Sequence, residues 1–147
     1  SIVTQKVQTT RFPVRGVMIH GEAQVVLVDT PGIFKPKPSR RIDRAMVRSA
    51  WAGTEDADAV VHLVDAQAQA AVADGAGASA ADRRAAEDVA AIVEALKAAG
   101  RKVILALNKI DGLKRHRLLV VADTLFRSEA YKEVFMISAA NGSGVDD

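Results

Sequence analysis

Apolar residues along this chain gather in short continuous runs, and between the runs they recur at the spacing of one helix face. The continuous runs predict strands at residues 11–19, 23–29, 58–66, 102–108 and 133–138. The helical spacing predicts helices at residues 41–51, 82–100 and 117–126. Residues 67–81 are rich in alanine and glycine, and we expect them to form a flexible connection.

The order of these elements predicts an α/β fold. The first two strands are separated only by a short turn at 20–22, so they form a hairpin. The later strands are apolar throughout and alternate with helices, which predicts a mostly parallel sheet covered on both faces, with the antiparallel hairpin at its edge. Ligands of such sheets bind beyond the carboxyl ends of the strands. Asp29, Asn108 and Ser138 each end a predicted strand.

Composition narrows the class of protein. The 147 residues suffice for one domain, and the 49% apolar and 26% charged fractions are those of a globular protein. Cysteine is absent, which excludes disulfides and cysteine-based metal sites. Basic residues dominate positions 1–53 and acidic residues dominate 54–100. The basic half either faces phosphate or RNA, or is a solvated charged surface.

The stretch Asn-Lys-Ile-Asp at 108–111 is the most informative motif. Asp111 can accept hydrogen bonds from a ring N–H and an exocyclic amino group that lie side by side, a pair that guanine offers and adenine does not. Asn108 can bond the other edge of the purine and brace neighbouring loops, and the stem of Lys109 can lie along the base. The alternative is a polar turn with asparagine and aspartate as turn formers.

Three further stretches are weak singly, because each also fits an ordinary loop. In Ser-Ala-Ala-Asn-Gly (138–142), a backbone N–H of Ala139 or Ala140 can donate to the exocyclic oxygen of a purine. In Asp-Thr-Pro-Gly (29–32), the carboxylate suits a hydrated magnesium ion and the glycine N–H suits a terminal phosphate. In Gln-Thr-Thr-Arg (8–11), the hydroxyl of Thr10, or less favourably that of Thr9, can bind the same ion.

Together, in this order, the motifs resemble those of the translation-factor class of GTPases, and within it the Era family. The resemblance covers essentially the whole chain and is carried by KVQTTR (6–11), LVDTPGI (27–33), VILALNKID (103–111) and VFMISAANGSGVD (134–146). It implies that residues 1–147 belong to a Ras-like GTPase domain that binds GTP and GDP with Mg²⁺. A monovalent cation is a further cofactor that it leaves open.

The resemblance also implies the residues of the site. GTP-binding positions would be Asp29, Thr30, Pro31, Gly32, Ile33, Asn108, Lys109, Asp111, Ser138, Ala139 and Ala140. The first switch would hold Gln8, Thr9, Thr10 and Arg11, and Mg²⁺ would lie at Thr10 and Asp29. Residues 35–41 would form the second switch, and their basic side chains either contact RNA or are solvated.

The sequence departs from the family pattern at two places and shares one unusual feature with it. Neither a Gly-x-x-x-x-Gly-Lys-Ser/Thr loop nor the Gly-x-x-Gly of a KH domain occurs in it. We therefore expect a GTPase domain incomplete at both ends, without its first strand, phosphate loop and first helix, and a KH domain downstream. Ile33 stands where many GTPases have a water-orienting glutamine, as in the Era family, so no catalytic residue is assigned. We expect slow GTP hydrolysis by the complete protein and none by residues 1–147 alone.

The implied biology is maturation of 16S rRNA and assembly of the 30S ribosomal subunit. The protein would be a cytoplasmic monomer that binds RNA through the KH domain; peripheral association with the inner membrane is left open. One alternative is a different Era-like GTPase, acting in tRNA modification or large-subunit assembly. The other is a degenerate interaction domain that binds no nucleotide.

Overall fold

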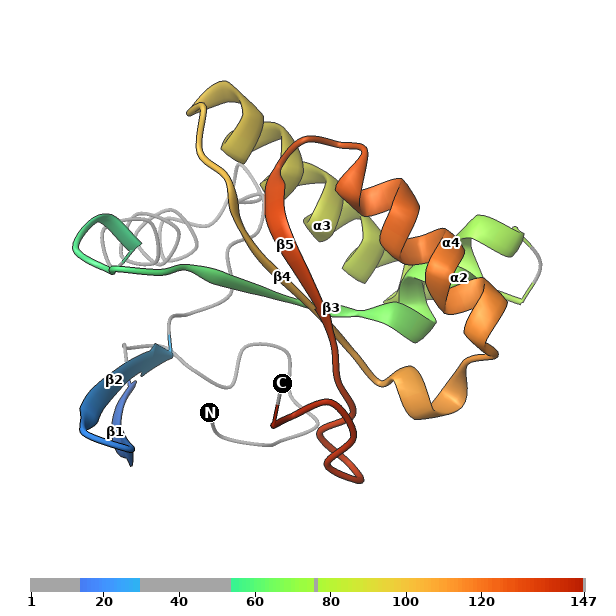
Figure 1. Cartoon of the computed structure of the whole chain (residues 1–147). Coiled ribbons are helices and arrows are strands. Elements are labelled where there is room, and N and C mark those ends of the chain that lie inside the picture. Colours follow the sequence, from blue (N-terminus) through green and yellow to red (C-terminus); the bar gives the residue numbers. More distant parts are fainter. Residues whose placement is uncertain (1–13, 30–53, 76, 147) are drawn as a thin grey trace. The chain divides into compact units, whose positions relative to one another are not determined.

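The computed structural model describes residues 14–29, 54–75 and 77–146. The chain divides into two units, residues 1–58 and 59–147, and each is described by itself (Figure 1). The helix predicted at 41–51 and the second switch predicted at 35–41 lie outside the described residues.

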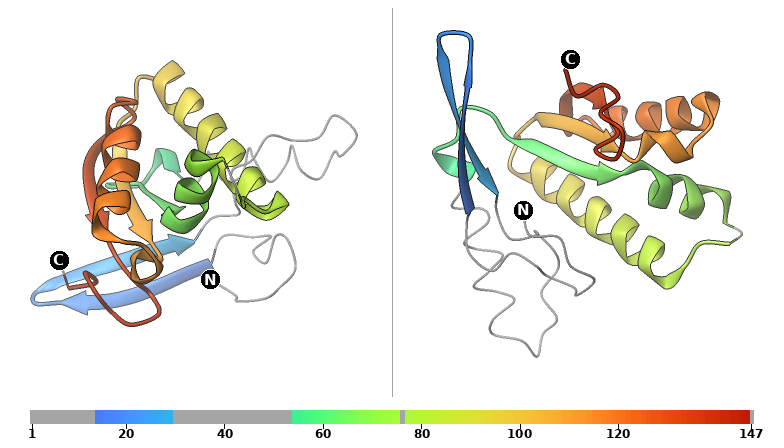
Figure 2. Two further views of the ribbon diagram at one scale, coloured as in Figure 1. Left: turned by 90° about the vertical axis from the view of Figure 1, so that its right-hand side faces the viewer. Right: turned by 90° about the horizontal axis from the view of Figure 1, so that it is seen from below.

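The first unit contains the predicted hairpin. Strands β1 (Val14–His20) and β2 (Ala23–Asp29) pair antiparallel, with His20 opposite Ala23. The turn requires a left-handed backbone at Gly21, where φ is +59°, which glycine adopts without a Cβ clash. Figure 2 shows the hairpin as a long two-stranded ribbon. The fold class predicted from the sequence, with its antiparallel hairpin, is confirmed at this end of the chain.

The second unit is built on a parallel sheet. In the described residues its strands are β3 (Val61–Asp65), β4 (Val103–Asn108) and β5 (Tyr131–Met136), in the order β3-β4-β5. Both pairings are parallel, and Asp65 lies opposite Asn108 in the register. The predicted parallel sheet is therefore confirmed. Because Asp65 and Asn108 each end their strand, their side chains start at the same edge.

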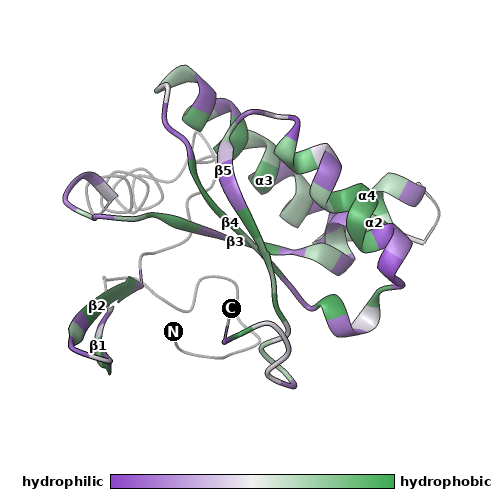
Figure 3. Cartoon of the chain, in the orientation of Figure 1, coloured by the Kyte–Doolittle hydropathy of each residue, from purple (hydrophilic) through white to green (hydrophobic). Residues whose placement is uncertain are grey.

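Helices cover one face of this sheet. Helices α2 (Ala66–Asp74), α3 (Ala80–Ala98) and α4 (Arg115–Phe126) lie together on one side of it (Figures 1 and 2). Under them the side chains of Val64, Leu105 and Leu107 are at most 1% exposed. On the alternate positions of β3, Val61 and Leu63 are 57% and 59% exposed, which Figure 3 shows as an apolar strand. The prediction that the sheet is covered on both faces stays a prediction.

The expectation of a flexible connection at 67–81 is wrong, because residues 66–74 form α2. Alanine is the strongest helix former, and it fills most of the positions of this helix. The Asp65 carboxylate caps the helix by accepting from the N–H groups of Gln67 (3.0 Å) and Ala68 (3.1 Å). Gly75, with φ of +73°, ends it.

Helix α3 follows its prediction, shifted by two residues. It starts with a capping box in which Ser79 and Asp82 bond each other's backbone N–H, and the Ser79 hydroxyl holds the pKa of Asp82 below its ordinary value. At its end Gly100, with φ of +64°, allows the Arg101 N–H to reach the carbonyl of Leu96 at 3.0 Å. The apolar face of α3 is buried at Val89, Val93 and Leu96.

Candidate nucleotide-binding site

The predicted base-binding residues lie just beyond the carboxyl ends of β4 and β5. Asn108 is the last residue of β4, and a single 3₁₀ turn, η1 (Ile110–Gly112), follows it. After β5 the chain forms the loop 137–146. The Ile137 N–H still donates to the Leu107 carbonyl at 2.8 Å, so this loop starts beside the end of β4.

Asn108 joins the two loops. Its Oδ1 accepts from the N–H of Lys109 at 2.8 Å and from the N–H of Ala139 at 3.0 Å. The second bond spans 31 residues of sequence, so it fixes the 138–142 stretch against the Asn-Lys-x-Asp stretch. To donate to a purine oxygen, the Ala139 N–H would have to leave Asn108 Oδ1 or divide its hydrogen bond between the two oxygens. Ala140, the next residue, is exposed.

Ser138 positions the carboxylate of Asp111. The Ser138 hydroxyl donates to Asp111 Oδ1 at 2.6 Å, and Ser138 itself is fully buried. The prediction that Ser138 ends a strand is wrong, because β5 stops at Met136. Two bonds divert the backbone there: Ser138 N–H donates to Ser143 O, and Gly142 N–H to Ser138 O, each at 2.8 Å. The turn thereby buries the hydroxyl under the carboxylate of Asp111.

Lys109 is held at both ends by residues that sequence reasoning missed. Its Nζ donates to Asp65 Oδ2 at 2.6 Å, and its carbonyl accepts from Gln67 Nε2 at 3.0 Å. Its backbone is left-handed, with φ of +64°. Asp65 could have been found from the sequence, because it ends an apolar run just as Asp29 does.

Two glycines lie close to neighbouring atoms. A Cβ on Gly144 would collide with the backbone carbonyl oxygen of Met136, whereas one on Gly112 would displace the flexible amide end of Gln67. Gly144 also has a left-handed backbone, with φ of +70°. The predicted base-binding turn and the 137–146 loop are therefore both packed closely against their neighbours.

The phosphate side of the predicted site falls largely outside the described residues. Thr30, Pro31, Gly32 and Ile33 lie there, as do the first-switch residues Gln8, Thr9, Thr10 and Arg11. Asp29 is half-buried at the end of β2, in the first unit.

Of the two residues predicted to bind Mg²⁺, Thr10 and Asp29, the structure describes only Asp29. Within the described ranges, no group of three or more His, Cys, Asp or Glu side chains could hold a metal ion. Mg²⁺ bound with a nucleotide needs only one or two protein ligands, since phosphates and water fill the rest of its shell. A single carboxylate at the end of a strand therefore fits the predicted ion.

Two other features of the second unit lie apart from these motifs. His62 Nδ1 and the Tyr131 hydroxyl are hydrogen-bonded at 2.8 Å across the sheet, with their rings stacked. Burial lowers the pKa of His62 to about 4 and raises that of Tyr131.

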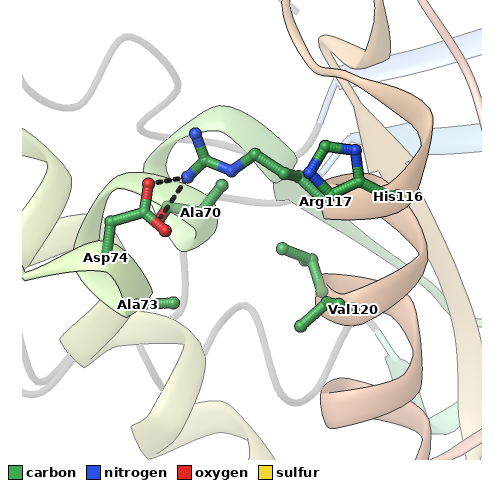
Figure 4. Close-up of a pocket in the computed structure, with 7 residues that line it drawn as sticks. Ala70, Ala73, Asp74, His116, Arg117 and Val120 are labelled. Carbon is green, nitrogen blue, oxygen red and sulfur yellow. Dashed lines mark hydrogen bonds and ion pairs between the residues drawn. The ribbon is translucent and has the colours of Figure 1, made fainter.

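A groove of about 420 Å³ lies between α2 and α4, where Arg117 pairs with Asp74 (Figure 4). None of the predicted site residues lines it.

No helix in the described ranges combines the length and the hydropathy that a bilayer span requires.

The fold is that of a GTPase domain, and comparison with known proteins gives the family. Residues 1–109 match the family of 50S ribosome-binding GTPases, and the chain belongs to that family. The resemblance to the Era family is also confirmed. The chain is 65% identical over 148 aligned residues to GTPase Era of Caulobacter vibrioides, covering 100% of this chain and 46% of the relative. It is 52% identical to GTPase Era of Maricaulis maris, covering 99% of this chain and 45% of the relative.

Solved structures give the same result for the fold. A crystal structure of Era in complex with MgGDPNP and nucleotides 1506–1542 of 16S ribosomal RNA matches with a TM-score of 0.73 and 30% identity. A variant of Aquifex aeolicus Era bound to GDP·AlF₄⁻ matches with a TM-score of 0.73 and 31% identity. Each match covers 99% of this chain and 45% of the solved chain. The chain thus spans less than half the length of the relatives it matches.

Proposed function

We propose that the protein carrying this chain binds GTP and GDP with Mg²⁺, hydrolyses GTP slowly and acts as a nucleotide-dependent switch. The observation that carries the proposal is the joined pair of loops around Asn108 and Asp111. The Asp111 carboxylate is held by Ser138 through one oxygen, while its residue is exposed to solvent. A fixed, accessible acceptor beside a strand end is what recognition of guanine needs.

Guanine selectivity follows from the hydrogen-bonding character of a carboxylate. Both oxygens of an ionised aspartate only accept, so Asp111 would bond the ring N–H and the amino group of guanine. Adenine presents an acceptor where guanine has the ring N–H, and that acceptor would face the carboxylate unpaired. Leaving such groups unpaired in a binding site costs enough to discriminate strongly between bases.

The phosphate side of the proposal rests on Asp29, Thr10 and the residues 30–33. Asp29 and Thr10 would hold Mg²⁺, which would neutralise part of the phosphate charge. Gly32 would donate its N–H to a terminal phosphate. The triphosphate would then order residues 6–11 and 29–41, and hydrolysis would release them. Isoleucine cannot orient water, so Ile33 would give slow turnover.

The proposed partners are 16S rRNA and the 30S subunit. Support comes from the solved relative that was crystallised with nucleotides 1506–1542 of 16S ribosomal RNA. The name of the matched family points instead to the 50S subunit, which keeps large-subunit assembly as the second candidate. Sedimentation of the full-length protein with purified subunits and GDPNP distinguishes them. Comigration with 30S particles supports the proposal, and comigration with 50S particles alone overturns it.

Nucleotide binding is tested by titrating full-length protein with GDP, ADP and XDP in the presence of Mg²⁺. Strong preference for GDP, together with slow phosphate release from GTP, is the expected result. Binding of no nucleotide would favour the degenerate interaction domain. The KH domain, the cytoplasmic location, the monomeric state, the monovalent cation and the peripheral membrane association stay predictions.

A further inference from the structure

The first turn of α2 holds Lys109 at both ends, the ammonium group and the backbone carbonyl. Asp65, immediately before the helix, accepts from Lys109 Nζ at 2.6 Å, and Gln67, in its first turn, donates to the Lys109 carbonyl at 3.0 Å. The two contacts span 44 and 42 residues of sequence. A helix that has no predicted contact with nucleotide is therefore bonded to the residue at the centre of the base-binding motif.

The two oxygens of Asp65 are divided between two tasks. Oδ1 accepts both N–H groups that cap α2, whereas Oδ2 accepts only from Lys109 among the described contacts. Capping alone would be served by asparagine, serine or threonine at this position. Capping α2 therefore leaves the second oxygen and the negative charge of Asp65 available to Lys109.

The backbone and the side chain of Lys109 each need a bonding partner to keep one conformation. Its left-handed backbone is uncommon for a residue with a Cβ and persists only where surroundings enforce it. Its side chain is 57% exposed and would otherwise sample many rotamers. The bond from Gln67 fixes the backbone, and the bond to Asp65 fixes the direction of the side chain.

We propose that Asp65 and Gln67 are positioning residues for guanine-nucleotide binding, which act by holding Lys109 in the orientation that covers the base. This inference rests on the proposed function. A lysine already held by Asp65 loses little further rotamer freedom when nucleotide binds, so preorganisation favours the complex. Loss of the pairing should weaken GDP binding about three- to tenfold, mainly through faster dissociation.

The test compares Asp65→Asn with Asp74→Asn in the full-length protein, with GDP affinity and dissociation rate as readouts. The asparagine introduced by Asp65→Asn still has a side-chain oxygen to cap α2 but cannot pair with the Lys109 charge. Asp74 lies at the other end of the same helix and pairs with Arg117 from α4, away from the base-binding loops. We expect Asp65→Asn to weaken GDP binding about three- to tenfold and Asp74→Asn to leave it unchanged.

A double-mutant cycle separates positioning from general structure. In a Lys109→Met background, Asp65→Asn should have no further effect on GDP dissociation, because the lysine through which it acts is gone. An equal effect in both backgrounds, or wild-type affinity of Asp65→Asn, would overturn the inference. If wild-type protein binds no GDP, the proposed function itself fails.

If the Asp65→Asn variant does not fold, Gln67→Ala tests the proposed positioning of Lys109. This variant leaves the Asp65 cap of α2 in place and removes only the donor to the Lys109 carbonyl. We expect GDP to dissociate about two- to fivefold faster with helix content unchanged. Dissociation of GDP at the wild-type rate would contradict the proposed positioning role of Gln67.

Discussion

The buried hydroxyl of Ser138 and the exposed carboxylate of Asp111, 27 residues apart in sequence, are joined by a 2.6 Å hydrogen bond. The bond brings the start of one loop under Asp111, the residue of the other loop that we predict to recognise guanine. We predict that Ser138→Ala weakens GDP binding about tenfold, near 1.4 kcal/mol, because Asp111 loses the donor that fixes it. Fluorescence titration of the full-length protein measures this. Ser128→Ala, just beyond the end of α4, is the matched control, and equal losses in both variants would contradict the role of Ser138.

The rate of GTP hydrolysis tests the prediction that Ile33 has no catalytic role. Isoleucine can neither donate nor accept a hydrogen bond, so Ile33→Ala should keep intrinsic GTP hydrolysis within about tenfold of wild type, near 1.4 kcal/mol in the barrier. Single-turnover phosphate release with saturating protein is the measurement. A loss of several orders of magnitude in a folded variant would show that the side chain shapes the water site.

Acid sensitivity is predicted from His62. Its pKa is lowered to about 4 in the folded protein by burial, against about 6.5 in the unfolded chain, so between these values the unfolded chain binds more protons. Stability should therefore be full above pH 6.5 and fall as the pH drops toward 4, by about 3 kcal/mol. Urea denaturation of full-length protein at a series of pH values follows this loss.

The matched variants for this prediction are His62→Gln and His116→Gln. Glutamine at position 62 can bond the Tyr131 hydroxyl but does not titrate, so the fall in stability between pH 6.5 and 4 should shrink. His116 is exposed at the start of α4, and its replacement should leave the profile as in wild type. Identical profiles for all three proteins would mean that His62 is not the group responsible.

Much of the fold could be predicted because its strands are continuous apolar runs. The β4 run was placed within one residue of its observed start, and α3 within two residues of both its ends. Helix α2 was missed because alanine has no clear place in an apolar–polar pattern, although Asp65 and Gly75 mark its ends. Pattern alone does not weigh helix propensity, which decides an alanine-rich segment.

The site was predictable where residue type alone sets the chemistry. Asn108 and Asp111 were found because guanine recognition needs these groups at this spacing. Asp65 could have been noted as the end of an apolar run, but its pairing with Lys109, like that of Gln67, depends on the register that places Asp65 opposite Asn108. That register belongs to the assembled sheet and has no signature within either segment.

Self-association is expected of residues 1–147 made alone. Val61 and Leu63 on β3 are more than half exposed, and an exposed apolar edge strand invites pairing with another chain. Leu63→Lys should reduce association measured by light scattering. Leu119→Lys, at a leucine on α4 that is 50% exposed, is the control and should change little. A monomeric, cooperatively melting polypeptide that binds GTP tightly would contradict this prediction.

The most direct test of the account is the base preference of Asp111→Asn in the full-length protein. An amide at this position offers a donor where guanine's amino group needs an acceptor, whereas the oxygen of xanthine accepts from it. Competition binding of GDP and XDP measures the preference. We predict that wild type prefers GDP and that the variant shifts toward XDP by about two orders of magnitude or more, consistent with the selectivity of sites built on hydrogen bonding. Unchanged preference for GDP over XDP in a folded variant would contradict the assignment of Asp111 as the residue that recognises guanine.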